Sequence, residues 1–170
     1  MSYNLRVWLR YCQVDKVILR EATTEDAPSL SAVILASFEE YRGRLDPPSG
    51  AHDQTVPTIR QKLVTAHAVV ASIDGEVVGC AFYEPEDDHI YLGRIAVLPQ
   101  YRRQGIASKL IAWVEAQTRS LGYARVRLAV RLVLDDNRAF YERHGYLFHS
   151  YGTHAGYAGP TFVNLEKNVA

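Results

Sequence analysis

The sequence predicts a mixed α/β fold in which a mostly antiparallel central sheet is flanked by helices. Short apolar and β-branched runs alternate with segments of helical periodicity along the chain. Three of those runs follow one another across turns, which is typical of an antiparallel meander. No linker or shift in composition divides the 170 residues. We therefore expect one domain over 16–170, after an extension, 1–15, of uncertain order.

The first half of the chain predicts strands around two helices. Pro57 favours a helix start immediately after a proline-rich loop. The Asp74-Gly75 pair separates two apolar runs and predicts a hairpin, which a third strand extends into a meander. The predicted strands are 16–20, 68–73, 76–83 and 89–97, and the predicted helices run from Thr23 or Thr24 to about Tyr41 and over 58–65.

The second half contains the best-defined helix. Apolar residues occupy one helical face, and Gly122 is well placed to end that helix in the left-handed conformation. Val126, Leu128 and Val130 then alternate with arginines and Ala129, as in a strand with one buried face. The predicted order is helix 103–121, strand 125–130, helix 137–144, and strands 146–151 and 162–165.

Composition and charge argue against several classes of protein. Lys+Arg and Asp+Glu both number 19, so net charge indicates neither nucleic acid nor an anionic membrane as a partner. The amino-terminal residues lack the apolar run of a signal peptide or a membrane span, which favours a cytoplasmic protein. Cys12 and Cys80 form no CxxC pair and have no histidine cluster nearby, so we expect neither metal nor disulfide.

The segment with the most chemical information is 95–109, IAVLPQYRRQGIASK, where a strand ends and a helix starts. The first N–H groups of a helix lack internal partners and attract an anion. Gly105 and Ala107 would let a pyrophosphate approach the backbone, and Arg102 and Arg103 add positive charge. The same residues could instead form a tolerant helix start beside a solvated basic face. Neither GxGxxG nor the Walker GK[ST] step is present.

This turn resembles the RxxGxA signature of the GNAT superfamily of N-acetyltransferases. The resemblance implies a GNAT-like fold that uses acetyl-CoA and no metal. It implies that 102–107, with Ser108 near, cradle the pyrophosphate of the coenzyme mainly through backbone amides. The matching residues are Arg102, Arg103, Gln104, Gly105, Ile106 and Ala107.

The resemblance also assigns roles to the strand before the turn. It implies that Ile95, Ala96 and Val97 hydrogen-bond the pantetheine arm, if this strand splays from 125–130 as its counterpart does in GNAT enzymes. The backbone N–H of Val97 is the implied donor to the oxyanion that forms during acyl transfer.

A second segment resembles the NxxAxxFYxxxGF pattern of the same family, with departures. Asn137 and Ala139 stand closer to the aromatic pair than in that pattern, and Tyr146 replaces phenylalanine. The resemblance implies that Asn137 contacts the coenzyme arm and that Tyr141 lies near the sulfur. A phenol is protonated at neutral pH and can donate a proton to the departing thiolate. Tyr141 could otherwise be a core aromatic paired with Phe140.

The general base is not evident, because the strand 89–97 lacks the carboxylate that many relatives carry there. Glu84 and His89 at neighbouring strand ends are the candidates, unless the amine arrives neutral. Acceptor contacts are expected from 38–52 and 151–160. Within the first of these, acidic residues beside Tyr41 could receive a cationic amine or simply be solvated.

The leading hypothesis is therefore an N-acetyltransferase that transfers the acetyl group of acetyl-CoA to a primary amine. The acceptor is a small molecule, an amino acid or a peptide terminus, and the amine attacks directly in a ternary complex. A non-catalytic acyl-CoA-binding or sensor module is the alternative, favoured by the missing strand carboxylate. A homodimer is compatible with the sequence.

Overall fold

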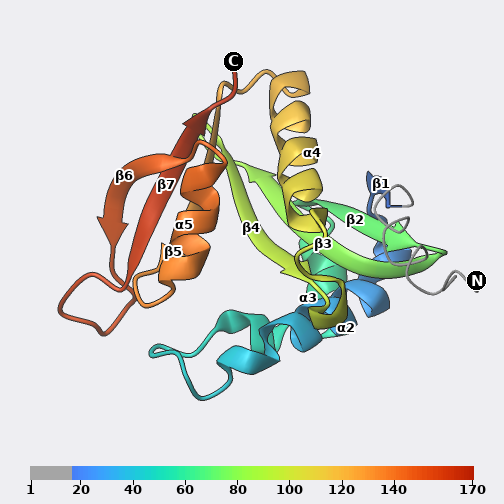
Figure 1. Cartoon of the computed structure of the whole chain (residues 1–170), viewed down its shortest axis with the longest axis horizontal. Coiled ribbons are helices and arrows are strands. Elements are labelled where there is room, and N and C mark those ends of the chain that lie inside the picture. The colour runs from blue at the N-terminus through green and yellow to red at the C-terminus, as the bar shows by residue number, and fades with distance from the viewer. Residues whose placement is uncertain (1–16) are drawn as a thin grey trace, which may run out of the picture.

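A seven-stranded mixed sheet organises residues 17–170, the part of the chain that this computed structural model describes (Figure 1). The strand order is β1-β2-β3-β4-β5-β7-β6, and every neighbouring pair is antiparallel except β4 and β5. The predicted mixed, mostly antiparallel sheet with flanking helices is confirmed. The extension 1–15 and Cys12 lie outside the described residues.

The elements follow one another as the periodicity predicts, with shifted ends. The strands are β1 (Ile18–Glu21), β2 (His67–Ile73), β3 (Glu76–Pro85), β4 (Ile90–Val97), β5 (Arg125–Arg131), β6 (Leu147–Gly152) and β7 (Phe162–Asn168). The α-helices are α2 (Ala27–Phe38), α3 (Val56–Lys62), α4 (Ile106–Ser120) and α5 (Asp135–Arg143).

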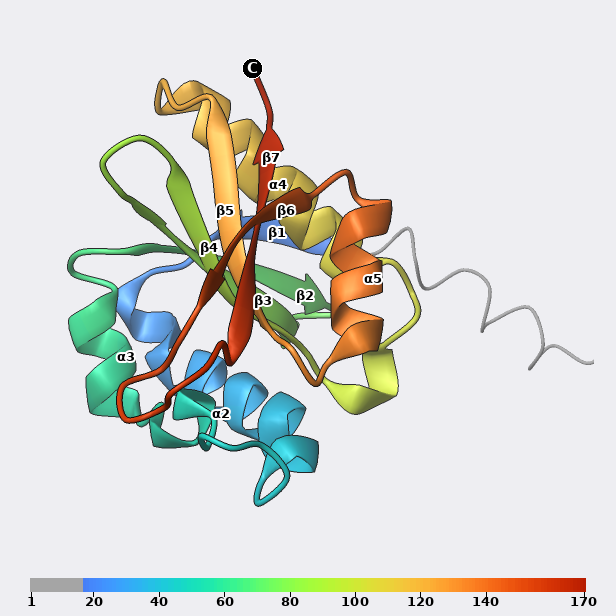
Figure 2. The same cartoon turned by 90° about the vertical axis from the view of Figure 1, so that its left-hand side faces the viewer.

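Alternation along the strands places a hydrophobic core on each face of the sheet. In β2, Val69 and Ala71 join the core that contains α4 residues, whereas Ala68 and Val70 join the core that contains α2 and α3 residues. Successive strand residues point to opposite faces. Helices α2 and α3 therefore cover one face, while α4 and α5 lie together on the other (Figure 2).

Residues in the left-handed conformation define the turn between β2 and β3 and the start of α4. Asp74 and Gly75 have φ of 50° and 84°, as a two-residue type I′ hairpin requires, so that turn is confirmed. The predicted helix start at Arg103 is wrong, because Arg103 and Gly105 have φ of 59° and 77° and cannot belong to a right-handed helix. Helix α4 begins at Ile106 instead.

Strand β4 departs from regular pairing along both of its edges. Toward β3, the register passes from Cys80↔Ala96 to Phe82↔Gly93, so β4 carries one extra residue, a β-bulge at Arg94 and Ile95. Arg94 has φ of 51°. Toward β5, pairing stops after Ile90↔Val126 and Tyr91↔Arg127. The two strands then diverge, as Figure 1 shows, and the last residues of β4 have no partner in β5.

The Asp26 carboxylate connects β1 to the start of α2. It accepts hydrogen bonds from Arg20 Nη1 and Nη2 (2.8 and 2.7 Å) and from Thr23 N (2.8 Å). The Asp26 side chain is only 11% exposed. The Arg20 hydrogen bonds outweigh the cost of burial and lower the pKa of Asp26 to about 2.

We expect Asp26→Asn to reduce the free energy of unfolding at pH 7 by about 2 kcal/mol, since one pKa unit corresponds to about 1.4 kcal/mol. A depressed carboxyl pKa stabilises the fold above the unfolded value and loses that contribution as pH falls through the folded value. The difference between wild type and variant should therefore shrink from about pH 4 to about pH 2. Urea unfolding at pH 7 and at pH 2.5 measures it, and an equal difference at both would contradict the assignment.

Residues 17–170 lack the features of two classes of protein. None of their helices is both long and apolar enough to cross a membrane. They also hold no group of three or more His, Cys, Asp or Glu side chains arranged for a metal ion. Cys80 is buried, and its burial raises the pKa of the thiol to about 12, so this thiol is protonated at neutral pH.

Candidate active site

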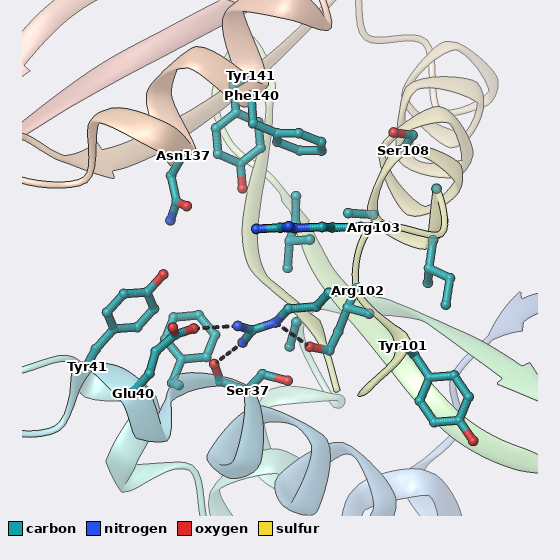
Figure 3. A pocket seen from close by; sticks show the side chains of 17 residues that line it. Ser37, Glu40, Tyr41, Tyr101, Arg102, Arg103, Ser108, Asn137, Phe140 and Tyr141 are labelled. Carbon is teal, nitrogen blue, oxygen red and sulfur yellow. Dashed lines mark hydrogen bonds and ion pairs between the residues drawn. The ribbon is translucent and has the colours of Figure 1, made fainter. Parts of the chain in front are cut away.

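A cavity of about 530 Å³ lies where the end of β4 meets the start of α4 and one face of α5 (Figure 3). Every residue that we expected to contact the coenzyme lines it except Gln104, whose side-chain amide donates instead to Gln100 O (3.4 Å). The predicted residues that line this coenzyme cavity are Ile95, Ala96, Val97, Arg102, Arg103, Gly105, Ile106, Ala107, Ser108, Asn137 and Tyr141.

The start of α4 has the geometry of an anion site. Its first internal hydrogen bond runs from Lys109 N to Gly105 O (3.0 Å), so the N–H groups of Ile106, Ala107 and Ser108 have no acceptor inside the helix. All three residues line the coenzyme cavity, and a Cβ added at Gly105 would meet no protein atom within 4 Å. Free donors beside open space suit a pyrophosphate at the positive end of a helix.

The two arginines of the turn have different surroundings. Arg102 donates from Nε to Val97 O (3.2 Å), from Nη2 to Ser37 O (2.8 Å) and from Nη1 to Glu40 (2.7 Å). Its guanidinium thus ties the end of α2 to the turn. Arg103 forms no ion pair with any residue that the structure describes, and its side chain extends into the cavity (Figure 3). Of the two arginines, Arg103 is therefore the one whose charge is available to a ligand.

Helix α5 contributes Asn137 and Tyr141, four residues apart and therefore on one helical face. The Tyr141 ring packs edge-on against Phe140 and Tyr146, at centroid distances of 5.3 and 6.1 Å. Its hydroxyl points into the cavity (Figure 3) and has no hydrogen-bond partner within residues 17–170. Burial raises the pKa of Tyr141 above its ordinary value. The side chain is thus both a packed aromatic and a neutral donor facing open space.

A second cavity, of about 780 Å³, lies between the diverging strands β4 and β5. Leu45, Pro48, Ser49 and Gly50 line it from one side and His154 from the other loop, so the two loops expected around the acceptor do meet there. The Tyr157 hydroxyl donates to Asp46 and joins these loops. The residues that line both cavities are Phe38, Tyr41, Ile95, Asn137 and Tyr141.

The structure does not place the expected general bases, Glu84 and His89, where the two cavities meet. Glu84 pairs with Lys62 Nζ (3.4 Å) and His89 Nδ1 with Asp88 (2.8 Å), and neither Glu84 nor His89 lines a cavity. Their role as bases stays a prediction. The acidic pair beside Tyr41 is also engaged, since Glu39 bonds Arg42 and Glu40 bonds Arg102.

Sequence reasoning did not single out the basic residues of the second cavity, although His154 lies in the expected loop 151–160. They are Lys62, Arg94, Arg131 and His154. They come from four separate elements, and no spacing relates them. The one available signal was Arg94, a charged residue within an apolar strand pattern.

Similarity to known proteins identifies the family to which the chain belongs. The Acetyltransferase (GNAT) family matches residues 34–146. An aminoalkylphosphonate N-acetyltransferase of Salmonella typhimurium is 31% identical over 138 residues, which cover 75% of this chain and 83% of the relative. The chain therefore belongs to the GNAT family of acetyltransferases, and it is an enzyme that uses acetyl-CoA as acyl donor.

Solved structures agree on the fold. The PaiA N-acetyltransferase of Thermoplasma acidophilum in complex with coenzyme A superimposes with a TM-score of 0.74 at 18% identity, over 89% of this chain and 98% of that one. The ribosomal-protein-S18-alanine N-acetyltransferase of Escherichia coli gives 0.71 at 18% identity, over 91% and 94%.

Proposed function

We propose that this acetyl-CoA-dependent N-acetyltransferase holds acetyl-CoA in the coenzyme cavity and its acceptor amine in the second cavity. The observation that carries the proposal is that Tyr141 lines both cavities. A thioester and an amine that approach from the two sides would meet beside its hydroxyl. Direct attack then requires no covalent enzyme intermediate.

The residues around that junction can serve each step of the transfer. The amine nitrogen attacks the thioester carbonyl, and the backbone N–H of Val97 donates to the oxyanion. The C–S bond then breaks, and Tyr141 gives its proton to the departing thiolate. The attacking nitrogen releases its extra proton to solvent, and a solvent proton restores the phenol. Its raised pKa keeps the phenol protonated for this step.

Coenzyme binding is proposed to rest mainly on the backbone. The free N–H groups that start α4 face the pyrophosphate, with Arg103 as the nearby charge and Arg102 as a positioning residue. The edge of β4 that β5 leaves unpaired offers Ile95, Ala96 and Val97 to the amides of the pantetheine arm. Asn137 contributes from α5.

The acceptor is proposed to be a small primary amine. A cavity of about 780 Å³ lies within the range of small-molecule sites, and the Salmonella relative acts on an aminoalkylphosphonate. No aspartate or glutamate is among the residues that line this cavity, which supports an amine that arrives already neutral.

Calorimetry followed by a thiol-release assay tests the proposal. We expect saturable binding of acetyl-CoA and of CoA but not of ATP, and release of free thiol when a small primary amine is added. Coenzyme binding without thiol release from any amine in a broad panel would indicate the sensor module instead. Failure to bind acetyl-CoA would remove the coenzyme assignment.

A further inference from the structure

The charged side chains that line the second cavity are all basic. They are Lys62, Arg94 and Arg131, with His154 beside them, and the lining includes no carboxylate. Lys62 already has an ion-pair partner in Glu84. Neither Arg94 nor Arg131 forms an ion pair with a carboxylate within residues 17–170. Two guanidinium groups therefore line this space without an ion-pair partner among those residues.

Arg94 is held in this position by the backbone. It occupies the β4 bulge with φ of 51°, and bulges re-aim side chains next to active sites. The guanidinium lies against Gly50, where an added Cβ would come within 3.2 Å of Nη2. Burial lowers the pKa of Arg94, and this effect is partly offset by Tyr91, which lines the same cavity, and by Asp53, which does not. An incompletely compensated cation is costly to bury.

Arg131 reaches the same space from the end of β5. Its Nη2 donates to Pro47 O (2.8 Å) and Pro48 O (3.1 Å), which leaves its other donors available. Burial lowers the pKa of Arg131, and this effect is partly offset by Tyr157 and Asp46. Arg94 and Arg131 both line the second cavity. The Asp46 carboxylate accepts a hydrogen bond from Tyr157.

We propose that Arg94 and Arg131 together bind an oxyanion on the acceptor, which is a small primary amine that carries a carboxylate or a phosphonate. The inference rests on the proposed function, because it assigns the second cavity to the acceptor. Guanidinium groups bind such planar or tetrahedral oxyanions through paired N–H donors, which fixes the orientation of the bound molecule. The anion would seat the acceptor, and its amine would point toward Tyr141.

The same charges account for the missing base. A positive potential favours the neutral form of an amine and lowers its pKa. The ammonium proton passes to solvent, and the free amine attacks the thioester. The potential would also favour the neutral form of an alkylamine that carries no anionic group. Such an amine would offer the two arginines nothing to bind, so it should be a poor acceptor.

Matched acceptors test this inference. We would compare 2-aminoethylphosphonate and β-alanine with propylamine, at saturating acetyl-CoA, by thiol release. Wild type should prefer an anionic amine over propylamine by about 100-fold in kcat/KM, since a site built to bond a polar group rejects analogues that lack it. Arg94→Gln and Arg131→Gln should abolish most of this preference, because the anionic amines should lose far more kcat/KM than propylamine does. Arg94→Lys should keep part of it.

Arg60→Gln is the matched control, because Arg60 is an exposed cation on α3 that lines neither cavity. It should retain the full preference. An equal kcat/KM of wild type for the anionic amines and propylamine would overturn the inference and leave the proposed function intact.

Calorimetry distinguishes a failure of the proposed function from a failure of the anion site. Titration of 2-aminoethylphosphonate into the CoA-saturated protein should show binding that is lost in Arg94→Gln and kept in Arg60→Gln. If no amine is acetylated, the proposed function fails, yet this binding would still support the anion site. Absence of binding to wild type would overturn the anion site. Unchanged acetyl-CoA affinity of each variant verifies that it is folded.

Discussion

Replacement of Tyr141 by phenylalanine is expected to lower kcat by about 100-fold while the dissociation constant for acetyl-CoA stays nearly constant, because the loss is that of one general acid. The ring contacts with Phe140 and Tyr146 remain in the variant. The hydroxyl has no partner within residues 17–170, so its removal leaves no buried group unsatisfied. Steady-state kinetics with saturating amine and calorimetry with acetyl-CoA measure the two quantities separately.

Tyr146→Phe provides the control for this experiment. Tyr146 is a fully buried neighbour whose hydroxyl donates to Glu115 (3.2 Å), and it lines neither cavity. Its variant should lose some stability and keep its kcat. Equal kcat for Tyr141→Phe and wild type would remove Tyr141 from the mechanism.

Gly105→Val is expected to weaken acetyl-CoA binding by about 100-fold. Gly105 has φ of 77°, where a β-branched residue is strained by about 1–3 kcal/mol. A side chain there would project into space that no protein atom fills, on the surface that we assign to the pyrophosphate. The ligand, rather than the protein core, would meet it. Calorimetry with acetyl-CoA and with CoA measures the change.

Helix α4 supplies a control with the same backbone strain at its other end. Gly122 has φ of 83°, and a Cβ there also meets no atom within 4 Å, but it lines neither cavity. Gly122→Val should therefore lower stability by a similar amount and leave coenzyme affinity unchanged. If both valine variants bind acetyl-CoA as wild type does, the pyrophosphate lies elsewhere.

The parts of the fold that depend on local chemistry were predictable from sequence. The Asp74-Gly75 hairpin was predictable because both of its residues tolerate positive φ. The alternation around Val126, Leu128 and Val130 located β5, since all three are buried. The start of α4 was misplaced by three residues because nothing in the side chain of Arg103 indicates its left-handed backbone.

The candidate site also has a part that was predictable from sequence and a part that was not. The coenzyme cavity is built largely from one continuous turn, so the RxxGxA resemblance located almost all of its lining. The second cavity forms where β4, β5 and two loops meet, and which way a side chain faces there depends on packing and on a bulge. Glu84 illustrates the limit, because its position at a strand end did not reveal that it would pair with Lys62 rather than face the cavity.

The divergence of β4 from β5 also bears on how such an enzyme could change its substrate. Main-chain amides on the free edge of β4 exist whatever side chains the strand carries, so donor recognition through them places few demands on the sequence. Acceptor recognition, in contrast, is proposed to depend on two side chains of different strands, Arg94 of β4 and Arg131 of β5. A new amine could therefore be selected by substitutions at these two positions while the acyl-donor site is inherited unaltered.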